Sequence, residues 1–285
     1  MSNGGYMKIK ISHMYEYLLS IERKDEISNL IKNIRCFDEY YKPQYLSEYV
    51  WNLIFSESFD RKELEDVISI LTKHKYEIEE EILDSISKCY QKLKTKKIYV
   101  FIFPIVRNEI TKVYFKFMGG IAASCPYKSI LLLFINPTTI NWRNFMRVAV
   151  FHEYTHCIRL NYFNPYLEEP TLLEYIIREG IGDVFVYRNL GVKPIWVIYS
   201  QKKAKEFYKL IIKNKDSKNR ALILKIMFGD GRKIPKWVGY AVGFNIVKSV
   251  MEENNLSFEK IIKMNASEIF NKYLTKRVRP SVNFI

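Results

Sequence analysis

The stretch Phe-His-Glu-Tyr-Thr-His at residues 151–156 constrains the fold and the chemistry of this chain more than any other part of it. It contains the pattern H-E-x-x-H within a segment whose apolar spacing predicts a helix. Residues four apart lie on the same helical face, so His152 and His156 can point ring nitrogens at one metal ion. Glu153 follows the first histidine and can reach a water molecule on that metal. Two of the four histidines of the chain lie here, and the stretch therefore predicts a metal site on a helix.

Two consecutive helices are predicted at and after this stretch. The first runs from about residue 141 to about residue 163; Asn141 can cap its start, and Asn164-Pro165 follows its end. The second runs from about residue 171 to about residue 189, and Gly191 just beyond it is a typical helix stop.

The metal needs a third protein ligand, because a catalytic zinc takes three protein ligands and one water molecule. No histidine follows His156, and positions 159 and 162 hold Arg and Tyr, so the longer pattern H-E-x-x-H-x-x-G-x-x-H is absent. A carboxylate from the next helix is what remains. The candidates there are Glu168, Glu169, Glu174, Glu179 and Asp183.

Glu179 and Asp183 are the best pair among these candidates, since residues four apart share one helical face. Glu179 can bind the metal while Asp183 accepts a hydrogen bond from the non-ligating nitrogen of a histidine ligand, which fixes the orientation of that ring. Gly180 and Gly182, which lie between these two residues, indicate two helices that approach closely at the metal. The alternative is that the two acidic residues form an ion-pair face with Arg178 or Arg159.

Short apolar runs before the metal stretch predict β-structure. Residues 98–103 and 130–135 read as buried strands, and residues 112–118 alternate loosely and indicate another strand. The small residues at 119–124 suit a sheet edge that pairs with an extended peptide, so Gly120, Ile121 and Ala122 are predicted to bind substrate. An ordinary tight strand or a bulge explains these small residues equally well.

The rest of the chain has the apolar spacing of helices, so we expect a mostly helical α+β fold. We expect an N-terminal helical region at residues 1–95, a core with the sheet and the metal-binding helices at 96–191, and a C-terminal helical region at 192–285. The histidines outside the metal stretch, His13 and His74, are predicted to be surface residues on charged helices.

The net charge of +14 is large, but it does not by itself indicate an anionic partner, because the basic residues are spread along the chain. Lysines occur in nearly every segment, and no basic run is interleaved with stacking aromatic residues, which indicates a solvated surface and no specific nucleic-acid site. No apolar run approaches the length that spans a bilayer. The N-terminus lacks a long apolar core, so the cytoplasm is the expected location.

The cysteines Cys36, Cys89, Cys125 and Cys157 show no C-x-x-C pairing. In a cytoplasmic protein they are expected to be reduced thiols. Cys157 follows His156 directly but points away from the histidine face of the helix, which favours a packing role.

The sequence resembles predicted bacterial zinc proteases of the gluzincin kind, the DUF2268 or YjaZ-like group. The similarity covers about residues 98–262. The matching pieces are His-Glu-Tyr-Thr-His at 152–156 with Arg159, Leu-Leu-Glu-Tyr-Ile-Ile at 172–177 leading into Glu-Gly-Ile-Gly-Asp at 179–183, and Pro-Lys-Trp-Val-Gly-Tyr at 235–240 followed by Gly243. The resemblance implies a zincin-like core, in which a small sheet packs on the motif helix, with Glu179 as third ligand and Asp183 one turn later. Gly182 stands where relatives often have alanine, and this departure leaves the ligand assignment unchanged.

The predicted function is therefore that of a zinc-dependent peptidase acting on peptides or proteins. Glu153 is expected to act as general base toward a water activated by Zn²⁺. Gluzincins commonly use a histidine or tyrosine to stabilise the developing oxyanion, and no downstream histidine exists here, so Tyr240 is chosen for this role with Arg232 in reserve. The alternatives are a zinc-binding protein without catalysis and a basic protein that binds nucleic acid or anionic surfaces.

Overall fold

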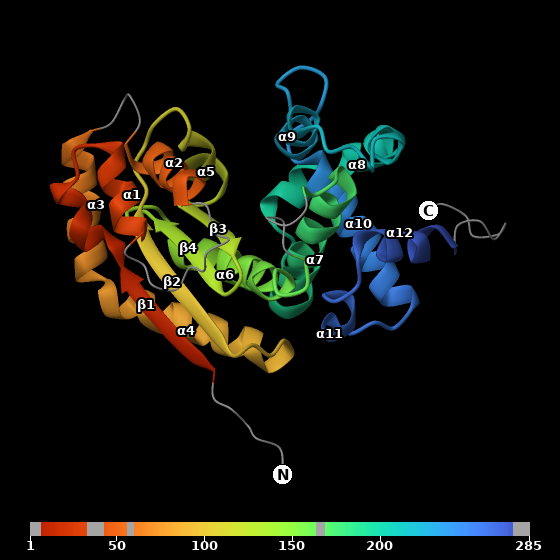
Figure 1. Cartoon of the computed structure of the whole chain (residues 1–285), viewed down its shortest axis with the longest axis horizontal. Helices are drawn as coiled ribbons and strands as arrows, with labels where there is room; N and C mark the ends of the chain where they lie inside the picture. The colour runs from red at the N-terminus through yellow and green to blue at the C-terminus, as the bar shows by residue number, and fades with distance from the viewer. Residues whose placement is uncertain (1–6, 33–42, 56–59, 164–168, 276–285) are drawn as a thin grey trace, which may run out of the picture. The chain divides into compact units, whose positions relative to one another are not determined.

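The structure is a computed structural model that describes residues 7–32, 43–55, 60–163 and 169–275 (Figure 1). The chain divides into two compact units, Met1–Ile158 and Arg159–Ile285. The first unit contains the sheet and the stretch with the two histidines, and the described residues of the second form helices and loops but no strand.

The first unit is built on a four-stranded mixed sheet of order β1-β2-β4-β3. Its strands are β1 (Lys8–His13), β2 (Lys97–Pro104), β3 (Ile121–Tyr127) and β4 (Ile130–Ile135). β2 is parallel to both β1 and β4, while β3 is antiparallel to β4 and forms an edge of the described sheet. The predicted strands at 98–103 and 130–135 are confirmed. All six residues of β4 are buried, as expected for a central strand covered on both faces.

The strand β1 corrects the expectation that residues 7–95 are helical throughout. Lys8 pairs with Lys97 and the register continues to His13 opposite Ile102. The sequence Lys-Ile-Lys-Ile-Ser alternates with a period of two, which is the signal of a strand with one face toward the core. His13 at its end is 8% exposed and its Nε2 lies within hydrogen-bond distance of Glu79 Oε1, so the prediction of a surface histidine on a helix was wrong.

The described residues of the first unit also form seven helical elements. They are η1 (Met14–Ser20), α1 (Lys24–Lys32), α2 (Pro43–Ile54), α3 (Arg61–Lys73), α4 (Lys75–Lys92), α5 (Lys112–Phe117) and α6 (Trp142–Arg159), of which α6 has only its last residue in the second unit. The helix α6 carries the H-E-x-x-H stretch and begins where predicted, although it ends four residues earlier than residue 163. Tyr154 on α6 donates a hydrogen bond to the Leu93 carbonyl at 2.6 Å, and Arg147 donates to Glu81 at 2.7 Å, which ties α6 to α4 and the segment after it.

The segment 112–118 is not a strand, because most of it forms the short helix α5. Its β-branched and aromatic residues favour a strand locally. The turn before it decides otherwise: Asn108 Oδ1 accepts hydrogen bonds from the backbone N–H groups of Ile110 and Thr111, both at 2.9 Å. An asparagine that satisfies two successive N–H groups starts a helical turn.

In the second unit, residues 169–275 form six helices around an apolar core. They are α7 (Leu172–Leu190), α8 (Ile195–Lys213), α9 (Arg220–Phe228), α10 (Val238–Glu253), α11 (Phe258–Ile261) and α12 (Ala266–Thr275). The predicted bounds of the second helix are confirmed in α7. Thr171 and Glu174 form a capping box at its start, and Gly191 ends it in the left-handed conformation with φ of 73°.

The helices α7 and α10 approach each other closely through two glycines. A Cβ atom on Gly180 would lie 2.4 Å from the Gly243 backbone, and one on Gly243 would lie 2.1 Å from the Ile176 carbonyl oxygen. The close helix contact expected near Glu179 is therefore present at Gly180, with α10 as the partner helix.

The described residues thus form a mostly helical protein with one small mixed sheet, the α+β class predicted from the sequence. Among them, no helix combines the length and the apolar character that crossing a membrane requires.

Candidate metal centre

His152 and His156 lie on the buried face of α6, one helical turn apart. His152 is 4% exposed and His156 is 6% exposed. The two Nε2 atoms lie 3.0 Å apart, and the imidazole rings are nearly perpendicular, at 89°. Both rings therefore direct the same type of nitrogen toward one small region, which is the arrangement that two histidine ligands of one metal require.

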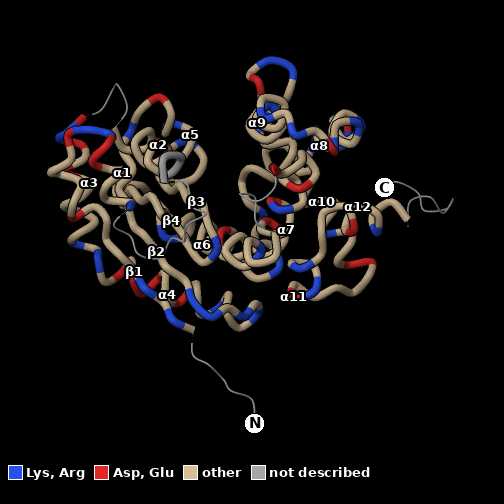
Figure 2. Tube along the Cα trace, in the orientation of Figure 1, with Lys and Arg blue, Asp and Glu red and all other residues tan. Residues whose placement is uncertain are grey.

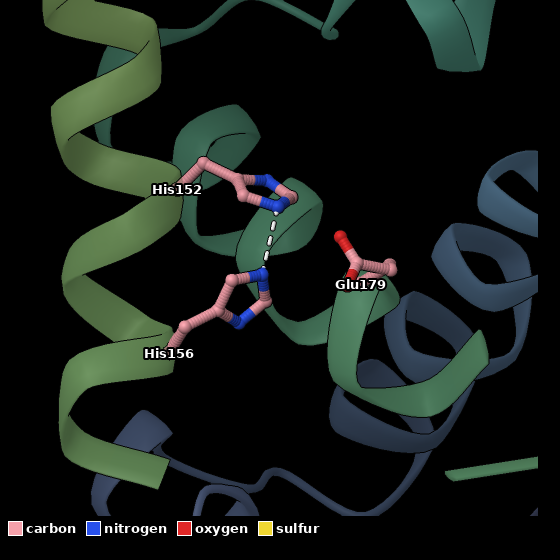
Figure 3. A group of neighbouring side chains, drawn as sticks. All are labelled: His152, His156 and Glu179. Atoms are coloured by element: carbon pink, nitrogen blue, oxygen red, sulfur yellow. Dashed lines mark hydrogen bonds between the residues drawn. The ribbon is translucent and has the colours of Figure 1, made fainter. Parts of the chain in front are cut away.

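Glu179 on α7 completes a group of three possible ligands. The ligand atoms of His152, His156 and Glu179 all lie within 4.8 Å of one another, and all three residues are buried (Figure 3). Among the described residues, no other group of three His, Cys, Asp or Glu side chains meets this criterion. Two imidazole nitrogens and one carboxylate oxygen are the donor set of many catalytic zinc sites, so the residues present fit zinc.

Arg178 forms an ion pair with the glutamate of this group. Its Nε and Nη2 donate to Glu179 Oε1 at 3.1 and 2.9 Å. Burial by itself lowers the pKa of the Arg178 guanidinium, but the charge of Glu179, with that of Tyr175, raises this pKa above its ordinary value. The ion pair that the sequence offered as an alternative is thus present for Glu179. A carboxylate has two oxygens and about four lone-pair sites, so this pair does not exclude a metal ligand role.

Arg159, the other possible ion-pair partner, has a different environment. Its Nη1 donates to the carbonyl oxygens of Ile262 and Met264, both at 3.1 Å, and its guanidinium lies 4.4 Å from the Phe163 ring centroid. Burial, followed by the positive charge of Arg178, lowers the pKa of Arg159 to about 10. This residue holds the segment after α11 in place.

Asp183 lies one turn after Glu179 on α7 and is fully buried. Its Oδ1 accepts a hydrogen bond from the Trp196 indole at 2.8 Å. A buried carboxylate needs such donors, because its desolvation is costly. The predicted hydrogen bond from a histidine ligand to Asp183 stays a prediction.

Glu153 is half-buried on α6 and has two tyrosines as neighbours that the sequence did not identify. Tyr49 on α2 and Tyr114 on α5 share a side-chain hydrogen bond. Burial raises the pKa of both phenols most strongly, and the negative charge of Glu153 raises both further. Nothing in the local sequence marks either residue, since α2 and α5 lie far from the motif along the chain.

Tyr240, the residue chosen to stabilise an oxyanion, lies half-buried near the start of α10. Its ring lies 6.1 Å from Trp196 and 6.3 Å from Phe228, centroid to centroid, and its negative charge would raise the pKa of Arg178. The reserve residue Arg232 is exposed, in a loop where its backbone N–H donates to Asp230. The catalytic role of either residue stays a prediction.

The small-residue segment forms the start of the edge strand β3. Gly120 has a φ of 69°, and a Cβ atom there would lie 2.8 Å from the Thr139 side chain, so the position requires glycine. Ile121 and Ala122 pair with β4, and the register shifts between Ser124 and Tyr127. The edge strand is present, and the irregularity in its register lies after most of the small residues. Binding of substrate to residues 120–122 stays a prediction.

The motif helix with its buried histidine pair, the small mixed sheet and the adjacent buried glutamate together define a zincin-like core. Residues 78–271 match the family DUF2268, described as "Predicted Zn-dependent protease". The chain belongs to this family.

Two curated relatives, both from Bacillus subtilis (strain 168), match parts of the chain. The uncharacterized protein YjaZ is 36% identical over 111 residues, which cover 37% of this chain and 42% of YjaZ. The uncharacterized protein YjfC is 23% identical over 152 residues, covering 49% of this chain and 50% of YjfC. The matches therefore span half or less of these relatives. No solved structure matches the chain.

Proposed function

We propose that this protein is a zinc-dependent peptidase of the gluzincin kind, with His152, His156 and Glu179 as the zinc ligands. The grouping of these three buried side chains within 4.8 Å carries the proposal. The family description points in the same direction. Asp183 is proposed to orient a ligand histidine from outside the ligand set.

In peptide hydrolysis a side chain of the protein has to carry a proton from the attacking water to the leaving amine. When bound, zinc supplies a Lewis acid that acidifies water and polarises a carbonyl group. Glu153, adjacent to the first histidine, takes a proton from the attacking water and returns it to the leaving amine. Tyr240 is proposed to donate its O–H to the oxygen that becomes negatively charged.

The substrate is proposed to be a peptide in extended conformation. The edge position of β3 supports this, because an edge strand presents unpaired backbone groups to a further strand. Gly120, Ile121 and Ala122 are the proposed contacts. A cytoplasmic location belongs to the same proposal.

The test is metal analysis combined with a peptide-library cleavage screen of the purified protein and of Glu153→Gln. We expect about one equivalent of zinc in both proteins and cleavage by the unmodified protein alone. Glutamine keeps the size and polarity of the side chain but cannot accept the proton. Equal cleavage by both proteins would contradict the role of Glu153.

The two other functions considered predict different results, the first in this experiment and the second in a binding titration at several salt concentrations. A zinc-binding protein without catalysis would carry the metal and cleave no library peptide in either form. A basic binding protein would show steeply salt-dependent association with nucleic acid or anionic vesicles. Figure 2 shows Lys and Arg on elements of both units with Asp and Glu between them, which supports a solvated charged surface over such a binding face.

A further inference from the structure

Two cysteine sulfur atoms of the first unit lie in direct contact. Cys125 is on the edge strand β3 and Cys157 is on the motif helix α6, and their Sγ atoms are 3.1 Å apart. A disulfide bond has a sulfur–sulfur distance of about 2.05 Å, so the atoms have to approach by only about 1 Å. No local pattern predicts this pair, because the two residues are 32 positions apart along the chain.

The backbone around both sulfur atoms is held in place by further contacts. Cys125 Sγ lies 3.2 Å from the Tyr127 carbonyl oxygen, and Cys157 Sγ lies 3.5 Å from that of Ile130. The Cys157 carbonyl accepts a hydrogen bond from the Ser129 N–H at 3.4 Å. The turn between β3 and β4 therefore rests against α6 at Cys157, and it keeps the two thiols together.

The two thiols differ in their access to reagents. Cys157 is 1% exposed, whereas Cys125 is only partly buried and lies where the register of β3 shifts. A strand is bent and less firmly paired at such an irregularity. A reagent therefore reaches Cys125 first, and Cys157 is positioned to react with whatever forms there.

We propose that Cys125 and Cys157 form a reversible modification site for low-molecular-weight disulfides, which join the two residues by an intramolecular disulfide bond. The sulfur of Cys125 attacks one sulfur of oxidised glutathione, forms a mixed disulfide and releases one reduced glutathione. The sulfur of Cys157 then attacks the Cys125 sulfur and releases the second glutathione. The two protons leave the two protein thiols and end on the two glutathione molecules, and the oxidant is reduced by two electrons.

Cys89 is the internal comparison for this site. It is fully buried on α4, and burial raises the pKa of its thiol well above the ordinary value. A buried thiol of this kind reacts slowly with disulfides. We expect oxidised glutathione to distinguish Cys125 from Cys89 in the native protein.

The disulfide would connect the edge strand to the helix that carries His152 and His156. It closes a loop between residues 125 and 157 that contains β4 and most of α6. Closing a loop of this size restricts the unfolded chain and stabilises the folded one. We therefore expect oxidation to raise the melting temperature by several degrees.

The experiment treats the native full-length protein with oxidised glutathione, blocks the remaining thiols with iodoacetamide and measures the intact mass. In the expected product Cys125 and Cys157 have together lost two hydrogens, carry neither glutathione nor an alkyl group, and yield a linked peptide pair; any other mass change comes from alkylation of the remaining cysteines, Cys36 and Cys89. Dithiothreitol should reverse both the mass change and the rise in melting temperature.

Two variants separate the steps of the reaction. Cys157→Ala should stop at the mixed disulfide and keep one glutathione on Cys125, while Cys125→Ser should gain neither the link nor the adduct there. If Cys157→Ala does not fold, Cys125→Ser at the partly exposed position still provides the comparison. Alkylation of both Cys125 and Cys157 in the treated native protein, or a glutathione adduct on Cys125 without the link, would overturn the proposal. A link without a rise in melting temperature would overturn the stabilising role.

Discussion

The Nε2 atoms of His152 and His156 lie 3.0 Å apart on one face of α6, with their rings at 89°. Two nitrogens bound at about 2.0–2.1 Å to a tetrahedral zinc ion lie roughly 3.3 Å from each other. The spacing of the pair is thus already close to that of a liganded pair. A single helix sets it, so the two nitrogens need little rearrangement to bind one ion.

Removing one of these nitrogens should abolish tight zinc binding. For His152→Ala we expect a loss of zinc affinity larger than the roughly 10–100-fold that follows loss of an outer partner of a ligand. Zinc content after dialysis and a competition titration with a chelator measure this. His74→Ala is the matched control, because His74 lies at the end of α3 and pairs with Glu77. Unchanged zinc binding in His152→Ala would contradict the site.

The third ligand is tested by Glu179→Ala. Loss of the only carboxylate in the group should strongly reduce zinc occupancy, and it leaves the guanidinium of Arg178 without its carboxylate partner. Glu174→Ala on the same helix is the control, since Glu174 is exposed and belongs to the capping box. That variant loses one capping hydrogen bond, worth about 0.5–1.5 kcal/mol, and should retain its zinc. Full zinc occupancy in Glu179→Ala would rule out this ligand assignment.

The role of Tyr240 is tested by Tyr240→Phe, which removes only the hydroxyl group. If the hydroxyl stabilises the oxyanion, kcat should fall by about 10²–10³ with KM and zinc content almost unchanged. Steady-state kinetics on a peptide found in the library screen measure both constants. Tyr187→Phe is the control, because Tyr187 packs against Phe244 on the same pair of helices. Equal kcat values for Tyr240→Phe and the unmodified protein would exclude Tyr240 from this role and leave Tyr49 and Tyr114 as the next hydroxyl groups to test.

The contact between α7 and α10 is tested by Gly180→Ala. The added methyl group would lie 2.4 Å from the Gly243 backbone, and backbone cannot move aside as a flexible side chain can. Overpacking of this kind costs about 1–3 kcal/mol. That cost exceeds the roughly 1 kcal/mol by which alanine favours a helix over glycine. Urea denaturation should therefore give a lower midpoint for the variant, and an unchanged or higher midpoint would show that the helices separate freely.

The local parts of the site could be predicted from the sequence, because helical spacing and end signals act over a few residues. The histidine pair depends on the four-residue spacing, and α7 has Thr171 and Gly191 at its ends. Glu179 was selected from five carboxylates because it shares one helical face with Asp183, four residues later. Its ion pair with Arg178 was foreseen as an alternative, and the structure contains both the pair and the ligand group.

The non-local parts could not be predicted in this way. The position of Tyr49 near Glu153 and the contact of Cys125 with Cys157 depend on how distant segments fold together. The errors at Lys8–His13 and at α5 have local causes. At Lys8–His13 the apolar residues alternate with a period of two, but the segment was assigned to a helical region. At α5 the hydrogen bonds that Asn108 accepts outweigh the strand preference of the residues that follow.

The pairing of β1 with β2 also determines when the first unit can fold. Lys8 lies opposite Lys97, so η1 and the helices α1 to α4 must all be synthesised before the two strands can meet. Closing such a long loop has an entropic cost that only later contacts offset, and contacts between distant residues slow folding. During translation β1 therefore leaves the ribosome before β2 has been synthesised, and its backbone groups stay unpaired until β2 emerges. A nascent chain that stops before β2 would keep this strand exposed for chaperones or proteases to bind.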